Sequence, residues 1–275
     1  MATEGSDTGS LHRGAMVLKL LTRAGRRGLA LSDLAVGSRI PHSSVHRVLR
    51  QLIDEDLAHH DAETRRYRLG PLAFELGLAS SALYDIRGVC KGEMESLAKA
   101  TGDIVYLVSR SGFEAVCVHS CEGNFPARPK PLDVGSRRPL GVGAGGLAIL
   151  SALCDDERNR IIEQISSVLP AFGTLDAKAL ELACQQSIAT KRAVVRHRVT
   201  FGVAAVGMPF RDVSGRPVGA LTVASFSQRM TQQRVDNIAD DLLIAVKALE
   251  AKLPLSASMM TAAAAANASK SASFT

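Results

Sequence analysis

The sequence predicts an α+β protein with a small, mainly helical N-terminal domain and a larger α/β domain. Its 275 residues, 46% of them hydrophobic, are enough for two domains of ordinary size. Residues 11–70 show the amphipathic pattern of three short helices followed by two extended pieces. Residues 88–253 mix strand-like and helix-like segments, which is typical of an α/β domain.

Three short helices and a hairpin are predicted within residues 10–70. Apolar residues recur at helical spacing over 11–24, and the glycines of Gly25–Gly28 end that helix. A second helix is expected to start at Ser32, a favoured N-cap residue, and to stop near Gly37. Pro41 marks the first turn of a third helix, whose inward stripe is Val45, Val48, Leu49, Leu52 and Ile53. Two extended pieces, 57–60 and 66–69, flank a polar turn.

This layout is typical of a winged helix-turn-helix domain, in which the third helix enters the major groove of DNA. Residues 11–70 hold 11 basic and 6 acidic side chains, whereas the whole chain has a net charge of only +6. A basic domain joined to a nearly neutral one indicates a polyanionic partner. The side chains expected to contact double-stranded operator DNA are Ser32, His42, Ser43, Ser44, His46, Arg47, Arg50, Arg65 and Arg66. A three-helix core whose polar face only meets water is the alternative.

A linker helix is predicted over residues 71–87, with an apolar stripe formed by Leu72, Leu76, Ala79, Leu83 and Ile86. Such a stripe outside both cores would face water unless a second copy of the chain covered it. We therefore expect a homodimer. Two such dimers pairing into a tetramer is the alternative assembly. Residues 1–9 and the Ala- and Ser-rich residues 254–275 are predicted to be disordered.

Residues 88–253 are predicted to form one α/β domain. Strands are expected over 104–109, 114–119, 203–210 and 218–225, and helices over 89–100, 145–153, 156–166, 176–190 and 231–252. No stretch approaches the roughly 20 apolar residues of a membrane-spanning helix, and the polar N-terminus is unlike a signal peptide. Five cysteines without a CxxC motif suit a reducing compartment. A cytoplasmic protein without membrane association is therefore expected.

Several segments carry a family resemblance, in order and at characteristic spacing. In the first domain they are Ser10–Ala15, Leu31–Ala35, Ile40–Leu49 and Arg66–Gly70. In the second they are Pro139–Gly145, Phe201–Val206, Pro209–Gly215 and Ala220–Val223. Over about residues 10–253 the chain resembles the isocitrate lyase regulator (IclR) family of bacterial transcriptional regulators. The resemblance implies a DNA-binding regulator, more often a repressor than an activator, with a C-terminal effector-binding domain similar to GAF-like sensor folds.

The same resemblance places an effector pocket between a helix that opens at Gly143 and the neighbouring strands. The residues it implies are Gly143, Ala144, Val195, Ala205, Thr222 and Ala224. Backbone N–H groups at a helix start favour an anion, and the pocket segments around Gly143, Ala205 and Thr222 contain no Lys or Arg. We therefore expect a small organic acid, such as a carboxylate, held mainly by backbone dipoles. A glycine-rich turn that only lets helix and sheet pack closely is the alternative.

The chain departs from the family pattern at three positions. His42 and Gly146 stand where many members have Lys, and Ala224 stands where some carboxylate-binding members have Ser. The change at His42 weakens an expected phosphate contact. The change at Ala224 leaves the chemical class of the effector open.

An NAD(P)-dependent enzyme is the alternative function, because residues 141–146 match G-x-G-x-x-G. That motif requires a buried strand directly before it and an acidic residue about 20 positions later. Residues 136–139 are polar and end in Pro139, and the acidic candidate Glu163 lies in an amphipathic helix. We therefore expect no enzymatic activity and no cofactor.

Cys117, His119 and Cys121 invite a metal site. On an extended strand the three side chains would share one face, with Cys117 and Cys121 about 13 Å apart. Bonds of about 2.3 Å to one zinc ion cannot span that distance. No metal site is therefore expected unless a bulge folds the strand back.

Overall fold

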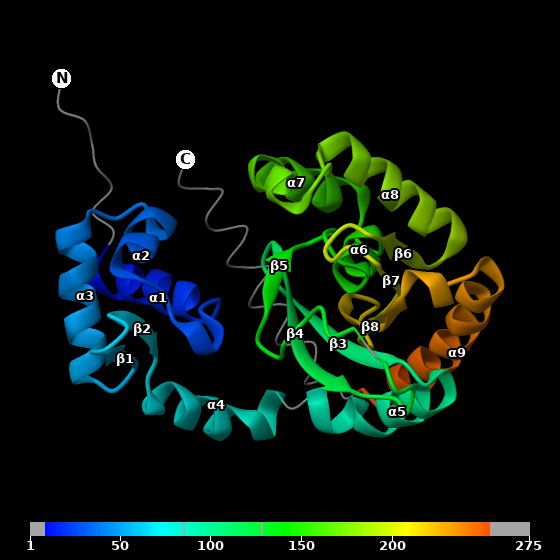
Figure 1. Cartoon of the computed structure of the whole chain (residues 1–275), viewed down its shortest axis with the longest axis horizontal. Coiled ribbons are helices and arrows are strands. Elements are labelled where there is room, and N and C mark those ends of the chain that lie inside the picture. The colour runs from blue at the N-terminus through cyan, green and yellow to red at the C-terminus, as the bar shows by residue number, and fades with distance from the viewer. Residues whose placement is uncertain (1–8, 85, 128, 254–275) are drawn as a thin grey trace. The chain divides into compact units, whose positions relative to one another are not determined.

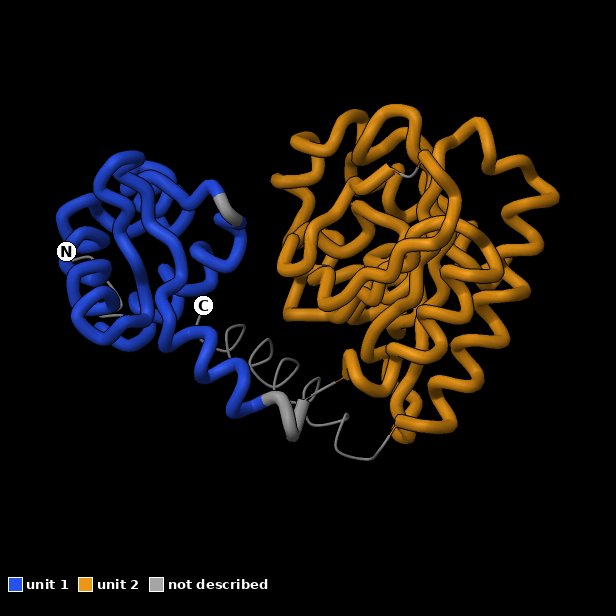
Figure 2. Tube along the Cα trace, turned by 60° about the horizontal axis from the view of Figure 1, so that its bottom comes forward, with its two compact units in different colours: residues 1–82 blue, residues 83–275 orange. Residues whose placement is uncertain are grey.

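The computed structural model describes residues 9–84, 86–127 and 129–253. The chain divides into two compact units, Met1–Ala82 and Leu83–Thr275 (Figure 2). The predicted disorder of residues 1–9 and 254–275 concerns segments that, apart from Gly9, lie outside the described residues. Within the described part, no helix has both the length and the apolar character that a membrane crossing requires.

Residues 10–69 of the first unit form three α-helices and a two-stranded wing (Figure 1). The helices are α1 (Ser10–Leu21), α2 (Leu31–Ser38) and α3 (His42–Asp54). The wing pairs β1 (Ala58–Asp61) with β2 (Arg66–Leu69) in antiparallel register. The predicted inward stripe of α3 is confirmed for four of its members, which are buried: Val45, Val48, Leu49 and Leu52. The fifth member, Ile53, is half-buried.

Helix α2 begins one residue earlier than predicted, with a different cap. Ala30 stands at the N-cap, and the Asp33 carboxylate accepts a hydrogen bond from the Ala30 N–H at 3.1 Å. Ser32 therefore lies inside the helix, because a carboxylate three residues after the N-cap already satisfies the exposed N–H. The helix also runs past Gly37, and Arg39 takes the left-handed position (φ 56°) that a glycine more often occupies.

The described residues of the predicted linker region are helical, with α4 (Pro71–Tyr84) before residue 85 and α5 (Ile86–Thr101) after it, and residue 85 itself lies outside the described residues. In the predicted apolar stripe Leu76 and Ala79 are exposed, Leu72 is half-buried, and Ile86 packs against the core of the second unit. Phe74, Leu76 and Leu78 are all exposed, and Phe74 and Leu78 lie one turn apart while Leu76 projects from the opposite side. The side chain of Leu83 lies outside the described residues.

The second unit contains a six-stranded sheet in the order β5-β4-β3-β8-β7-β6. The four long strands, confirmed by the structure, are β3 (Ile104–Ser111), β4 (Glu114–Cys121), β7 (Val203–Arg211) and β8 (Pro217–Phe226). The edge strands β5 (Arg137–Pro139) and β6 (Ala193–Arg196) are missing from the prediction. Three or four residues that include Arg or Pro give no readable alternation.

Helices cover both faces of this sheet (Figure 1). The core on one face includes α6 (Ala144–Ser151), α7 (Asp155–Ile165) and α8 (Ala177–Thr190), and the core on the other includes α5 and α9 (Gln232–Glu250). Alternate residues of β3 serve the two cores, with Tyr106 and Val108 on the α6 side. The predicted fold class, α+β with a helix-turn-helix domain and an α/β domain, is thereby confirmed.

Candidate functional site

The outward face of α3 carries most of the predicted DNA-contacting side chains. Five of them are exposed and one, Ser44, is half-buried; the exposed ones are His42, Ser43, His46, Arg47 and Arg50. Ser32 is exposed on α2. This placement follows from the burial of the apolar stripe on the opposite side of α3. The face offers cations and hydroxyls, the groups that bind phosphate oxygens and base edges.

The wing arginines differ in what they already bind. Arg65 is exposed in the turn between β1 and β2, with a left-handed backbone (φ 54°). Arg66 donates from Nη1 to the Gly28 carbonyl oxygen at 3.0 Å, so part of its guanidinium supports the wing. Arg68 forms an ion pair with Asp61 at 3.0 Å. Of the two predicted wing contacts, Arg65 is therefore better placed to meet a phosphate than Arg66.

The second unit contains a cavity on the α6 side of the sheet. Residues of all six strands line it, together with the start of α6 and residues 198–200 after β6. The volume of the cavity is about 70 Å³. All six pocket residues implied by the family resemblance lie on its wall: Gly143, Ala144, Val195, Ala205, Thr222 and Ala224.

Glycines at the start of α6 have two different roles. A Cβ atom on Gly145 would stand 2.8 Å from both Thr222 Oγ1 and Val108 Cγ2. Gly145 therefore permits close packing of helix on sheet, which is the alternative that the sequence left open. At Gly143, the N-cap residue, a Cβ would meet no atom within 4 Å. Packing does not require a glycine there, and the adjoining helix start contributes a partial positive charge to the cavity.

Two buried hydroxyl groups on the cavity wall lack a hydrogen-bond partner among the described residues, Tyr106 Oη and Thr222 Oγ1. Their exposed fractions are 1% and 5%. Burial raises the pKa of Tyr106 well above its usual value, although the nearby Leu132 main chain opposes this shift. The phenol therefore stays protonated at neutral pH. Because a buried polar group without a partner costs free energy, a ligand with acceptor atoms would stabilise this wall.

Arg138 and Arg198 also line the cavity, and the sequence prediction missed both. Arg138 Nη2 donates to the Pro131 carbonyl oxygen at 2.8 Å, and Arg198 Nη1 donates to the Gly141 carbonyl oxygen at 3.1 Å. Within the described residues, neither guanidinium forms an ion pair with a carboxylate. Burial lowers the pKa of both groups, but arginine remains charged at neutral pH. The cavity wall therefore contains two cations in addition to the backbone dipoles that the sequence predicts.

The glycine-rich residues 141–146 do not belong to a dinucleotide-binding fold. A strand does precede them, contrary to the prediction, but β5 is a short edge strand antiparallel to β4. The described strands of this sheet all pair antiparallel, whereas a dinucleotide site needs a parallel strand–helix–strand unit.

The prediction that Cys117, His119 and Cys121 share one face of β4 is wrong. The register between β3 and β4 shifts where Val108 pairs with Cys117 and Leu107 with His119. This bulge leaves Cys117 in the α6-side core and Cys121 against the core of α5 and α9. In the described part of the chain, no group of three or more His, Cys, Asp or Glu side chains could hold a metal ion.

Comparison with known proteins assigns both units to one family. The family model described as IclR helix-turn-helix domain matches residues 10–62, and the model described as bacterial transcriptional regulator IclR C-terminal matches residues 79–251. The regulator KipR of Bacillus subtilis is 28% identical over 226 residues, which cover 82% of this chain and 90% of KipR. The repressor AllR of Escherichia coli is 27% identical over 227 residues, which cover 82% of this chain and 83% of AllR.

A solved structure shows the same fold. It is the crystal structure of an IclR homologue from Microbacterium hydrocarbonoxydans complexed with 4-hydroxybenzoate, with a TM-score of 0.66 and 19% identity. The match covers 88% of this chain and 100% of the homologue. Since the two family models together account for most of its length, the chain belongs to the IclR family of bacterial transcriptional regulators.

Proposed function

We propose that this regulator binds operator DNA through α3 and the wing, and that a small organic acid in the cavity modulates the binding. The observation that carries the effector proposal is the presence of Arg138 and Arg198, without acidic partners among the described residues, on the cavity wall. A buried cation without a counter-charge is unfavourable, so an anionic ligand would be favoured there. The 4-hydroxybenzoate bound in the family structure is itself an organic acid.

We propose that the protein represses transcription and that binding of the ligand releases the protein from its operator. The support is the repressor AllR among the relatives. The protein would act in the cytoplasm, where its DNA lies, and neither a metal nor a cofactor enters the proposal. Catalysis is not part of it, since regulators of this family are not generally enzymes.

A homodimer is the assembly that this function requires. One wing and one recognition helix cover too little DNA for tight, specific binding, so two copies should read a pseudo-palindromic site. The exposed Phe74, Leu76 and Leu78 of α4 offer apolar surface for the contact. Leu76→Glu should weaken the dimer, and light scattering that finds wild-type monomers at micromolar concentration would contradict this assembly. For a dimer of dimers, light scattering would give twice the mass of the dimer.

The function can be tested by thermal unfolding with a panel of aliphatic and aromatic acids, with NAD and NADP in the same plate. An acid at 100 times its Kd should stabilise the fold by about 2.7 kcal/mol. Footprinting with that acid should then show weaker protection of DNA. Stabilisation by a nicotinamide cofactor in place of an acid would instead support the enzyme alternative.

Ala144→Leu is the variant that locates the ligand, because Ala144 is buried on the cavity wall. The added side chain should abolish the acid-induced shift and leave DNA binding intact. Ala100→Leu makes the same chemical change at an exposed position of α5 and serves as the control. An Ala144→Leu protein that keeps the full shift would show that the ligand binds elsewhere.

A further inference from the structure

Most half-buried arginines of the second unit bind a carboxylate. The pairs are Arg110 with Glu157, Arg137 with Glu114, Arg158 with Asp155, Arg192 with Asp236, and both Arg229 and Arg234 with Asp103. This pattern agrees with the cost of burying a charge without a partner. Arg138 and Arg198 are the half-buried arginines of this unit that lack such a pair within the described residues, and both line the cavity.

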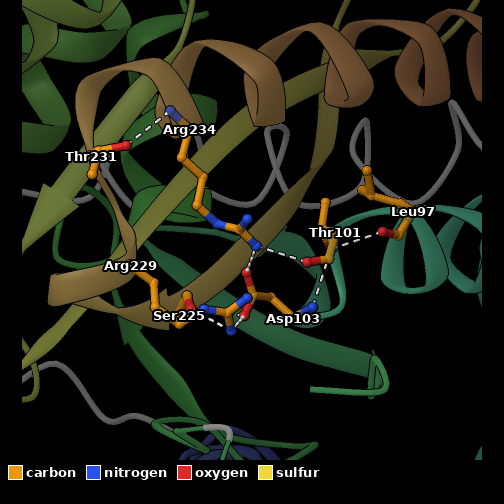
Figure 3. A network of polar contacts seen from close by, with 7 residues as sticks. All are labelled: Leu97, Thr101, Asp103, Ser225, Arg229, Thr231 and Arg234. Carbon is orange, nitrogen blue, oxygen red and sulfur yellow. Dashed lines mark hydrogen bonds and ion pairs between the residues drawn. The ribbon is translucent and has the colours of Figure 1, made fainter.

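The cluster around Asp103 shows how this fold satisfies a buried guanidinium (Figure 3). Asp103 Oδ1 accepts from Arg229 Nη1 at 2.5 Å, and Oδ2 accepts from Arg234 Nη2 at 2.7 Å. Ser225 Oγ donates to Asp103 Oδ1 at 2.7 Å, and Arg234 also donates to the Thr101 carbonyl oxygen. One carboxylate with a hydroxyl donor beside it completes the site. The cavity wall likewise combines arginines with hydroxyls, but among its described residues no Asp or Glu plays the part of Asp103.

Arg138 and Arg198 come from opposite edges of the sheet. Arg138 lies on β5, the first strand in the sheet order, and Arg198 follows β6, the last. Four strands lie between these edges, and the Arg198 side chain reaches across to the Gly141 carbonyl oxygen, just after β5, at 3.1 Å. All four contribute residues to the cavity wall. The cavity therefore extends across the strands, with a cation contributed from each side.

The two guanidiniums also have different surroundings. Arg138 donates to the Pro131 carbonyl oxygen and interacts electrostatically with Tyr106 and Cys117. Arg198 donates to the Gly141 carbonyl oxygen, just before α6, and interacts with Cys184 of α8. The two guanidiniums thus donate to different main-chain oxygens, one at Pro131 and one at Gly141. Each arginine therefore has its own main-chain acceptor and a positive charge that no carboxylate of the described residues balances.

We infer that the effector is a dicarboxylate, with one carboxylate at Arg138 and the other at Arg198. The Tyr106 and Thr222 hydroxyls, which are cross-strand partners in the middle of the sheet, supply donors between the two ends. The cavity volume of about 70 Å³ favours a short diacid over a long one. This inference rests on the proposed function, because it assumes that the cavity binds the effector.

The test is a binding series of α,ω-dicarboxylates with four to eight carbons against monocarboxylates of the same chain lengths. Calorimetry should show one preferred diacid length, and that diacid should bind at least about tenfold more tightly than its monoacid. Arg138→Gln and Arg198→Gln should each weaken the diacid by about 10- to 100-fold. In each variant the diacid and the monoacid should bind almost equally, because only one cation remains.

Arg160→Gln, which removes an exposed arginine of α7, is the matched control and should leave the series unchanged. Unliganded Arg138→Gln and Arg198→Gln should unfold at or above the wild-type temperature, since each removes a buried cation. The contrary result is that monoacids bind as tightly as diacids, with both variants weakening the binding by the same factor. That result would show one carboxylate held by both arginines. The inference would then fail, and the proposed function would stand. Failure of every acid to bind would overturn both.

Discussion

Tyr106 of β3 and Thr222 of β8 are directly opposite each other in the sheet, and both of their hydroxyl groups are buried without a hydrogen-bond partner among the described residues. Native proteins rarely leave such groups unsatisfied. Ser225, three positions along β8 from Thr222, has a buried hydroxyl that donates to Asp103 at 2.7 Å. The same strand thus offers one hydroxyl that stabilises the unliganded protein and one whose bonding capacity is unused.

Replacing an unused hydroxyl should cost the unliganded protein little. Thr222→Val keeps the side-chain shape and removes a group that has no partner among the described residues, so the free energy of unfolding should change by less than about 1 kcal/mol, or rise. Ser225→Ala removes a charge-assisted bond and should cost about 1.5–3 kcal/mol. Urea unfolding of both variants gives the comparison. A Thr222→Val protein destabilised as much as Ser225→Ala would show that Thr222 has a structural partner.

Gly145 should be intolerant of even one methyl group. A Cβ there would lie 2.8 Å from Thr222 Oγ1 and from Val108 Cγ2, so α6 would have to move away from the sheet. We expect Gly145→Ala to lower the free energy of unfolding by about 1–3 kcal/mol, as overpacking of a core does. Gly92→Ala, in α5 with no atom within 4 Å, should instead stabilise by about 0.5–1 kcal/mol. Unchanged stability of Gly145→Ala would contradict the close packing of α6 on the sheet.

Long periodic segments were predictable from the sequence, and short ones were not. The amphipathic pattern of α3 and the alternation of β3 and β8 depend on neighbouring residues, so a local pattern contains enough information. Strands β5 and β6 form because they pair with β4 and β7, and that pairing is a long-range event. The start of α2 was also misplaced, because Asp33 rather than Ser32 supplies the capping interaction.

The residues of the cavity wall also differ in whether the sequence identifies them. The family resemblance maps positions along the chain and so identifies Gly143, Ala144 and Thr222. The structure brings these residues together on the cavity wall. Arg138 lies in one of the two strands that the periodicity missed and Arg198 directly follows the other, at opposite edges of the sheet. Only the assembled sheet shows that both reach the cavity. A single sequence contains no signal that would join them.

Alkaline pH should destabilise the second unit through Cys117. Burial raises the pKa of Cys117 to about 11 from its usual 9.0. As the pH rises above 9, the unfolded chain loses the thiol proton while the folded protein keeps it, so stability falls until the pH reaches about 11. The loss should approach 2–3 kcal/mol, because each pH unit between the two pKa values lowers the free energy of unfolding by about 1.36 kcal/mol. Urea unfolding between pH 8 and 11 should show this slope.

Cys117→Ala isolates that contribution. The variant should be less stable at pH 8 because it leaves a small void, but its stability should fall less steeply between pH 9 and 11. Tyr106 and the other buried thiols remain in both proteins, so the difference between the two slopes reports Cys117 alone. Parallel curves would show that the thiol titrates at its ordinary pKa.

Arg47 is the side chain of α3 whose loss should most clearly affect DNA recognition. It is exposed, one turn from Arg50, on the face opposite the buried stripe. Arg47→Ala should weaken binding to a DNA fragment selected by the wild-type protein by about 1–3 kcal/mol, and a base contact would also relax specificity at one position. A phosphate contact would instead reduce the slope of log K against log salt by about one. Arg160→Ala, which removes the same charge from the second unit, is the control. Footprints of Arg47→Ala that match the wild type in affinity, sequence preference and salt slope would remove Arg47 from the DNA-binding surface.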